Sequence, residues 1–360
     1  MMEKDQEIEL KLAILDQAEE NKIISDEFLL SLTASTWQAA KLVSTYYDTQ
    51  QRILQKNRLT FRIRNTGQGY EATVKGGGRS EGGLHERQEW NVPLVVAQAD
   101  SSIFSDTTVG EKLRQLVSED KLIPMFITEF VRKKLLVHYG SSLIEIAVDH
   151  GQISVGELIA PISELELELK SGKSLDLIQL GGVLAEKFQL RLEQKSKYHR
   201  AIALAGVSPA IGSLRSDQPL YLLWSYIEKE ARFMASPGLP TARYEVIQYL
   251  DKLQLKIMKL AAGVDPESHC LEILDEFRLL FQPLREADFI GVHFRRLIDK
   301  GEITPSYHRE LGQVYRSHLH KITRDLLTAL RQGATTPYVL KLWAILATAK
   351  TPRAASERFT

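Results

Sequence analysis

Charged and apolar residues alternate along eight short segments within the first 170 or so residues of the chain. Alternation with a period of two predicts a β-strand that has one polar and one apolar face. Glycine, asparagine, aspartate or proline ends these segments, so we expect antiparallel strands joined mainly by hairpins. The segments are EIELKL (7–12), KLVSTYYDT, LTFRIRNTG, YEATVKGGG, HERQEWNVP, FVRKKLLVHYG, SLIEIAVDHG and ISELELELKSG.

The charged face of the predicted strands carries basic and acidic side chains together. If this face met water, the apolar faces would close around a dry core. If it faced inward, helices would have to cover the apolar faces from outside. Periodicity alone leaves both arrangements open. The face consists of Glu7, Glu9, Lys11, Arg62, Arg64, Lys75, Arg87, Glu89, Arg132, Lys134, Glu145, Asp149, Glu164, Glu166 and Glu168.

The chemistry of these side chains favours the inward arrangement. Converging guanidinium and ammonium groups make a site for phosphate oxygens. Three glutamates on one strand face repel each other unless a cation lies between them. Oxygen ligands without clustered cysteine or histidine favour Mg²⁺ or Mn²⁺ over zinc. Cations, acidic metal ligands and a phosphate chain together indicate metal-assisted phosphoryl transfer.

Helical patterns flank the strands and then replace them. We expect helices at about 25–34, 109–119 and 173–189, and we expect GGGRSEGG (76–83) to be a flexible loop. From about residue 217 the period becomes helical, with five or six helices up to about residue 349. The sequence therefore predicts an α+β chain, in which a β-domain is joined to an all-α helical bundle.

Composition narrows the class of protein. The apolar share of 44% and the charged share of 26% are ordinary for a soluble globular protein. Equal numbers of basic and acidic residues, 46 each, give no overall field for nucleic acid. No apolar stretch is long enough for a membrane helix. The single Cys270 fits a reducing compartment, so we expect a cytoplasmic enzyme or binding protein.

The order of these motifs resembles the CYTH superfamily, the triphosphate tunnel metalloenzymes. The resemblance covers about residues 3–205. It implies an eight-stranded antiparallel barrel with a charged tunnel, Mg²⁺ or Mn²⁺ as cofactor, and hydrolysis of a triphosphate. It rests on Glu7-x-Glu9-x-Lys11, YYDT (46–49), FRIR (61–64), TVK (73–75), ERQEW (86–90), EIAVDHG (145–151), ELELELKSG (164–172) and KSKYHRA (195–201).

The resemblance also implies a role for each charged position. Glu7 and Glu9 would bind metal, with further ligands from among Glu164, Glu166 and Glu168. Glu145 and Asp149 would orient the attacking water or hold a second metal. Lys197 corresponds to a late lysine near the tunnel mouth, with Lys195 as the alternative. The phosphate-binding set would be Lys11, Arg62, Arg64, Lys75, Arg87, Arg132 and Lys197, and we expect His85, His138, His150 and His199 at the surface or at strand ends rather than among the ligands.

The helical half resembles a CHAD domain, a basic helical bundle associated with polyphosphate that follows the barrel in the inorganic triphosphatase branch. The segment 265–281 resembles its entry motif, with His269 in the matching place. Acidic residues replace most of the arginines expected after that histidine, so we expect a degenerate or truncated domain at 217–350. HFRRL (293–297) and the histidines at 308, 318 and 320 could still form a basic patch.

Three functions remain open from the sequence. The first is an inorganic triphosphatase that splits triphosphate into pyrophosphate and phosphate. The second is a thiamine or nucleoside triphosphatase, or an adenylate cyclase, with Tyr46, Tyr47 or Trp90 as an aromatic shelf for the organic group. The third is a polyphosphate-binding module with an inert barrel. The seven acids to which the resemblance gives a role argue against the third, because an anion binder gains nothing from them.

Overall fold

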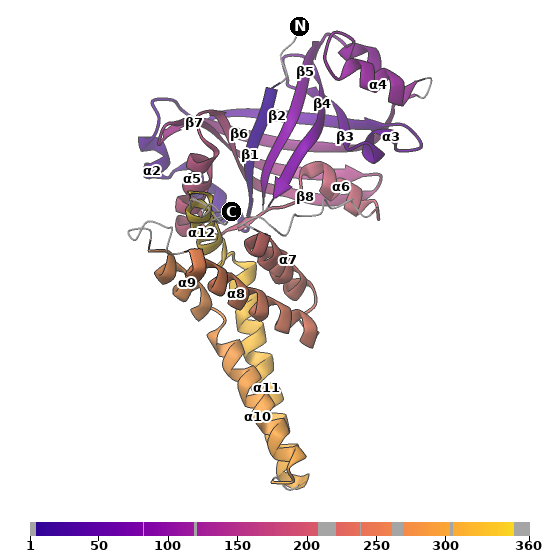
Figure 1. Cartoon of the computed structure of the whole chain (residues 1–360). Helices are drawn as coiled ribbons and strands as arrows, with labels where there is room; N and C mark the ends of the chain where they lie inside the picture. Colours follow the sequence, from indigo (N-terminus) through magenta and orange to yellow (C-terminus); the bar gives the residue numbers. More distant parts are fainter. Residues whose placement is uncertain are drawn as a thin grey trace, which may run out of the picture. The chain divides into compact units, whose positions relative to one another are not determined.

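The computed structural model describes residues 5–81, 83–118, 121–207, 221–237, 239–260, 269–302 and 305–348. The chain divides into two compact units, Met1–Ser213 and Leu214–Thr360. The first contains the strands and the second contains helices (Figure 1).

All eight predicted segments form strands of one antiparallel sheet. The strand order is β5-β4-β3-β2-β6-β7-β8-β1, and β1 pairs again with β5, so the sheet closes into a barrel (Figure 1). A short ninth strand, which the periodicity did not predict, pairs with β1. The strands are β1 (Asp5–Ile14), β2 (Gln38–Asp48), β3 (Leu59–Asn65), β4 (Tyr70–Glu81), β5 (Leu84–Leu94), β6 (Ile123–Tyr139), β7 (Ser142–Val155), β8 (Leu158–Ser171) and β9 (Leu190–Leu192).

Helices cover the apolar faces of the strands from outside. The long α5 packs against β1, β7 and β8, where leucines such as Leu10 and Leu165 are fully buried. The expected helices at 109–119 and 173–189 correspond to α4 and α5, while the expected 25–34 helix is shorter. The helices of this unit are α1 (Gln17–Ile24), α2 (Glu27–Ser31), α3 (Ile53–Lys56), η1 (Ser101–Phe104), α4 (Gly110–Val117), α5 (Ser174–Lys187) and α6 (Lys197–Leu204).

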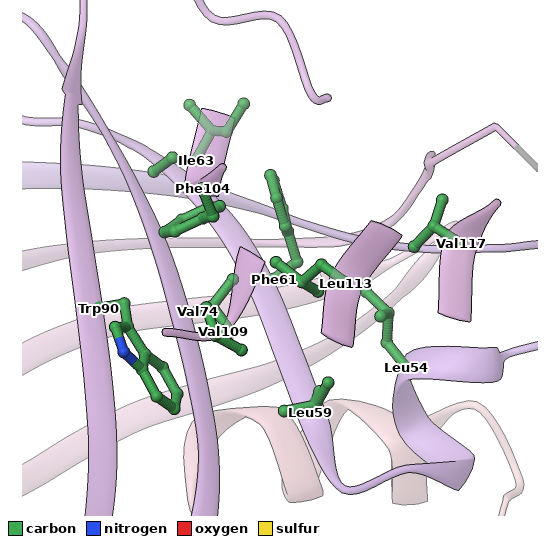
Figure 2. Close-up of a cluster of buried hydrophobic side chains, with 11 residues drawn as sticks. Leu54, Leu59, Phe61, Ile63, Val74, Trp90, Phe104, Val109, Leu113 and Val117 are labelled. Carbon is green, nitrogen blue, oxygen red and sulfur yellow. The ribbon is translucent and has the colours of Figure 1, made fainter. Parts of the chain in front are cut away.

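A second covering layer lies over β3, β4 and β5. Phe61 and Trp90 project from the outer face of these strands toward Phe104 of η1 and Leu113 of α4 (Figure 2). Phe61, Phe104 and Leu113 are fully buried, and the indole N–H of Trp90 donates to the hydroxyl of Thr108 at 2.9 Å. Because the apolar faces meet helices, the charged faces of the same strands point into the barrel, which confirms the inward arrangement.

The glycine-rich segment 76–83 was predicted to be a flexible loop, but residues 76–81 belong to a strand, and Gly82 lies outside the described residues. Strand β4 continues to Glu81 and pairs with β5, with a bulge between Gly76 and Arg79. Gly78 has φ +85°, and a Cβ there would lie 1.8 Å from the carbonyl oxygen of Glu86. Only glycine tolerates this left-handed, crowded backbone, so the glycines form the bulge rather than a hinge.

The second unit consists of helices with an apolar interior. Tyr226, Phe233, Phe277 and Phe281 are fully buried there, and the rings of Tyr226 and Phe277 meet edge to face with centroids 5.0 Å apart. The helices are α7 (Tyr221–Ala235), α8 (Pro240–Leu260), α9 (Cys270–Leu279), α10 (Gln282–Asp299), α11 (Pro305–Arg331) and α12 (Thr336–Thr348). No described helix has the length and apolar character required to cross a bilayer.

Candidate active site in the barrel lumen

Alternation along the strands brings the predicted site residues into the barrel lumen. Each belongs to the face opposite the helix-covered leucines, and most contact a charged residue from another strand. Lys197, the first residue of α6, joins them from outside the sheet. The set is Glu7, Glu9, Lys11, Arg62, Arg64, Lys75, Arg87, Arg132, Glu145, Asp149, Glu164, Glu166, Glu168 and Lys197.

Three buried carboxylates form the centre of the site. Asp149 on β7 and Glu164 and Glu166 on β8 each offer an oxygen within 4.8 Å of the others. We call these three residues the acidic triad. The ammonium of Lys197 contacts all three, at 2.6 Å from Asp149 and 3.0 Å from Glu166. The three carboxylates therefore share one cation, the Lys197 ammonium.

Glu166 is the most heavily paired carboxylate of the triad. Lys11 and Lys197 donate to its Oε1, and Arg132 donates to its Oε2. Burial favours the neutral acid, but the three cations outweigh burial and hold the pKa of Glu166 well below its usual value. At Glu164, burial together with repulsion from Glu166 and Asp149 raises the pKa despite Lys197.

The cations facing the triad are held in their charged form. Burial disfavours the Lys11 ammonium, but Glu166 and Glu9 outweigh it and raise its pKa well above the usual value. Arg132 binds Asp149 in a two-pronged contact, with both N–O distances at 2.7 Å. This bidentate geometry fixes the guanidinium plane in the lumen.

A second carboxylate group lies beside the triad and is paired differently. Both oxygens of Glu7 accept from Lys75 at 2.6 Å, and Glu9 accepts from Lys11 at 2.8 Å. Lys75 also contacts Glu89 at 3.2 Å, a lumen residue that the resemblance assigned no role. Glu168 pairs with Lys170 at 2.7 Å.

Of the predicted metal ligands, Glu164 and Glu166 therefore meet in one cluster, together with Asp149, which was expected to orient water or hold a second metal. Glu7, Glu9 and Glu168 lie outside the only such cluster that the described residues form.

The lumen is closed at one end and open at the other. Tyr46, Phe126 and Ile153 fill one end, with the Tyr46 and Phe126 rings stacked at 4.5 Å. Toward the other end the exposed fraction of the side chains rises, from 0% at Asp149 to 15% at Glu145 and 27% at Glu168. A substrate would therefore reach the triad past Glu145 and Glu168.

Several secondary expectations are decided by side-chain position. Lys195, the alternative to Lys197, is exposed. Tyr47 and Trp90 pack in the outer layer, so neither can form a shelf for an organic group inside the lumen.

The histidines divide in the same way. His138 and His150 are exposed as expected. His85 is not at the surface but fully buried, and it shares the lumen face of β5 with Arg87 and Glu89. The period of two that placed Arg87 inward could have found it.

Among the residues whose side chains are described, the predicted basic residues of the helical unit form no comparable site, and the side chain of His308 lies outside that part. His269 is an exposed residue at the start of α9 and contacts Glu272 at 2.8 Å. His293, Arg295, Arg296, His318 and His320 are exposed. Residues 265–268 of the entry motif lie outside the described part of the chain, as does the segment 208–220.

The acidic triad fits a hard divalent cation. Its ligand atoms are buried carboxylate oxygens only, and the ammonium of Lys197 already lies among them. Mg²⁺ and Mn²⁺ prefer such ligands.

Comparison with known proteins agrees with this geometry. The chain is 36% identical over 204 residues to the inorganic triphosphatase of Haemophilus influenzae, which covers 55% of this chain and 55% of that protein. The chain thus matches about half the length of this curated relative.

Two solved structures each match about half of this chain. A putative adenylyl cyclase from Hippeastrum, described as having a dominant triphosphatase activity, is 13% identical with a TM-score of 0.41, over 56% of this chain and 96% of that chain. The Mimivirus capping enzyme triphosphatase is 13% identical with a TM-score of 0.31, over 51% and 87% of the two chains. Residues 5–202, more than half of the sequence, match the CYTH domain, and the chain therefore belongs to the CYTH domain family.

Proposed function

We propose that the protein is a metal-dependent inorganic triphosphatase, which hydrolyses triphosphate to pyrophosphate and phosphate inside the barrel. The observation that carries the proposal is the combination of a buried acidic triad with a ring of lysines and arginines in one enclosed lumen. The similarity to the Haemophilus influenzae inorganic triphosphatase supports the same chemistry.

The basic side chains have the task of binding and neutralising the phosphate chain. Lys11, Lys75 and Arg132 keep their charge by pairing with carboxylates, and an entering triphosphate competes for those contacts. Arg62 lies 3.7 Å from Glu89, a longer contact than those that Lys75 and Arg132 make with their carboxylates. Because these groups are fixed before the substrate arrives, little reorganisation is needed during the reaction.

The acidic side chains divide into two roles. Asp149, Glu164 and Glu166 would hold Mg²⁺ or Mn²⁺, with Lys197 leaving their centre. Such an ion would neutralise charge on the phosphate oxygens. Glu145 is the better candidate to orient the attacking water, because its carboxylate keeps 15% exposure while Asp149 is fully enclosed. Glu7 would position Lys75, and Glu9 would position Lys11. Glu168 would position Lys170 at the mouth of the lumen.

The aromatic end of the lumen favours an inorganic chain over an organic triphosphate. Tyr46 and Phe126 fill that end, and Phe130 stands under the cations, with Lys197 4.8 Å from its ring centroid. An organic group would have to remain at the open mouth, where neither Tyr47 nor Trp90 can stack on it. Thiamine or nucleoside triphosphates and cyclisation of ATP are the alternatives that the experiment must exclude.

The wider assignment has three parts. Residues 1–205 would be the catalytic CYTH domain, and 217–350 a degenerate CHAD-like helical domain that could meet polyphosphate through exposed residues such as Arg295 and His318. We place the enzyme in the cytoplasm, because its only cysteine is a free, buried thiol. We expect no nucleic-acid or membrane partner.

The test is phosphate release by the purified protein. We expect rapid release from inorganic triphosphate with Mg²⁺ or Mn²⁺, none with EDTA, and slower release from thiamine triphosphate and ATP under the same conditions. Equal activity with EDTA would contradict the metal requirement. A preference for ATP, or cyclic AMP as product, would contradict the inorganic substrate.

A further inference from the structure

Two guanidinium groups of the lumen are held by neutral acceptors rather than by carboxylates. Arg64 donates from Nε to the hydroxyl of Ser44 at 3.1 Å, and Nη2 of Arg87 lies 3.0 Å from Nδ1 of His85. Lys11, Lys75, Arg132 and Lys197 all contact carboxylates instead. Within the described part of the chain, neither Arg64 nor Arg87 has an ion-pair partner within 4.0 Å.

The contact between Arg87 and His85 fixes the protonation of the imidazole. A guanidinium has only donors, so Nδ1 of His85 must accept. A neutral imidazole then carries its proton on Nε2. The hydrogen bond is therefore charge-assisted, with the positive charge entirely on Arg87.

The surroundings of His85 keep the imidazole neutral. It is fully buried on β5, opposite Glu9 across the β1–β5 pairing, and it faces Lys11, Arg87 and His199. Burial lowers the pKa of His85 to about 3, since Arg87, Lys11 and His199 reinforce burial and Glu9 only partly opposes it. Arg87 consequently has the same acceptor throughout the neutral pH range.

We propose that His85 is a positioning residue that holds the Arg87 guanidinium in the lumen through a neutral acceptor and so leaves its charge for the phosphate chain. This inference rests on the proposed triphosphatase function and adds a residue to it. A carboxylate at the same place would also fix the guanidinium, but it would cancel the charge that attracts the substrate. Ser44 is likewise a neutral acceptor that holds Arg64.

Three substitutions of His85 separate geometry from charge. His85→Asn places an amide oxygen where Nδ1 lies and keeps a neutral acceptor. His85→Leu removes the acceptor, and His85→Asp has nearly the shape of the asparagine variant but adds a negative charge. The measurement is kcat and KM for inorganic triphosphate, with the melting temperature confirming that each variant is folded. The matched control is His138→Leu, an exposed histidine on β6 outside the site.

We expect His85→Leu to raise KM roughly tenfold to a hundredfold with little change in kcat, because a hydrogen bond to a charged group is lost. His85→Asn should stay within about threefold of the wild type, and His85→Asp should raise KM at least as much as leucine does. Combining His85→Leu with Arg87→Ala should be no worse than Arg87→Ala alone, because the histidine acts through the arginine.

Equal KM values for the asparagine, aspartate and leucine variants, or additive effects in the double variant, would overturn the inference. If the wild type does not hydrolyse triphosphate, the proposed function fails first. Nitrogen NMR of labelled histidine then decides the inference separately. An Nε2–H tautomer that persists from about pH 8 to about pH 5, and is lost when Arg87 is replaced by alanine, supports it. An Nδ1–H tautomer, or titration near about 6.5, overturns it.

Discussion

The barrel lumen and the interior of the helical unit contain opposite kinds of side chain. The barrel encloses Asp149 and Glu164 at 0% exposure, surrounded by lysines and arginines, whereas the helical unit encloses rings such as Phe277 and Phe281. Buried ion pairs can often be replaced by apolar residues without loss of stability. Stability alone therefore does not account for so many ion pairs in the lumen. Binding of a charged ligand by the same side chains does account for them.

The helical unit contains an informative exception. Glu230 is buried at 7% exposure, yet its oxygens accept from the hydroxyls of Tyr226 and Thr335, the latter at 2.9 Å. Two hydroxyl donors contact this carboxylate, while three cations contact Glu166. We expect Glu230 to serve the fold and Glu166 to serve the site.

The largest expected effect comes from Glu166→Gln. The substitution keeps the shape of the side chain but removes the charge on which Lys11, Arg132 and Lys197 converge. We expect kcat/KM for triphosphate to fall by roughly a hundredfold to a thousandfold, comparable to losing one preorganised electrostatic contact elsewhere. Steady-state kinetics at saturating Mg²⁺ measures it.

The matched control is Glu230→Gln. Triphosphatase activity should remain within about twofold of the wild type, while the free energy of unfolding of the helical unit falls by about 1–3 kcal/mol because a buried hydrogen-bond network is disturbed. If Glu230→Gln abolished hydrolysis, the distinction between the two buried carboxylates would be lost.

Acid should destabilise the barrel before it affects the helices. The folded barrel holds His85 neutral to about pH 3, while the unfolded chain takes up the proton below about 6.5. The associated stability is complete above about 6.5 and is lost progressively as the pH falls toward 3. At pH 5 the loss is about 2 kcal/mol, a factor of roughly 30 in the unfolding equilibrium.

Hydrogen exchange of individual amides at pH 7 and pH 5 resolves the two units. Protection in β1 and β5 should decrease once the intrinsic pH effect is removed, and His85→Asn should reduce that decrease. Protection in α9 and α12 should not follow, because the helical unit has no buried histidine among the residues whose exposure is described. A parallel loss in α9 would refute the prediction.

Removing the ammonium from the acidic triad should strengthen metal binding. Lys197 occupies the position between Asp149, Glu164 and Glu166 that a divalent ion would take. We expect Lys197→Met to bind Mn²⁺ about tenfold more tightly, because a competing positive charge within contact distance has gone. Electron paramagnetic resonance of free Mn²⁺ measures the affinity, and Lys195→Met is the exposed control. If Lys197→Met binds Mn²⁺ with the affinity of the wild type, the metal site is not the acidic triad.

The smallest effect is expected on the surface of the helical unit. Arg232 contacts Glu245 at 3.0 Å, but its side chain is 51% exposed. Arg232→Gln should change the free energy of unfolding by less than about 0.5 kcal/mol, about twofold in the equilibrium, and leave hydrolysis unchanged. Thermal unfolding checks it. If Arg232→Gln lowered the free energy of unfolding as much as Glu230→Gln does, exposed ion pairs would contribute as much to the stability of this unit as its buried contacts.

The strands of the barrel could be predicted from the sequence because alternation is a local property. Which face pointed inward did not follow from periodicity, since the pattern is the same for either face. The chemistry of the charged side chains favoured the inward arrangement, and the outer layer around Phe61 and Trp90 confirms it. The bulge at Gly77 and Gly78 was taken for a loop, because glycine gives a weak strand signal and the bulge depends on the close approach of Glu86.

Which residues line the lumen followed from the alternation and from the resemblance, but the pairing between them did not. Asp149 joins Glu164 and Glu166 because β7 and β8 are neighbours with Asp149 directly opposite Glu164, a register that no single strand specifies. The contacts of His85 with Arg87 and of Ser44 with Arg64 could not be predicted, because nothing in the sequence around His85 or Ser44 indicates an acceptor for an arginine.

The position of β1 has a consequence for how the protein is made. This first strand pairs on one edge with β5 and on the other with β8, so that Glu9 lies beside both His85 and Glu168. A ribosome must deliver some 160 further residues before the second edge exists, and pairings so distant in sequence form slowly. Until then the growing chain carries an unsealed sheet whose charged inner face is exposed to water and dissolved ions.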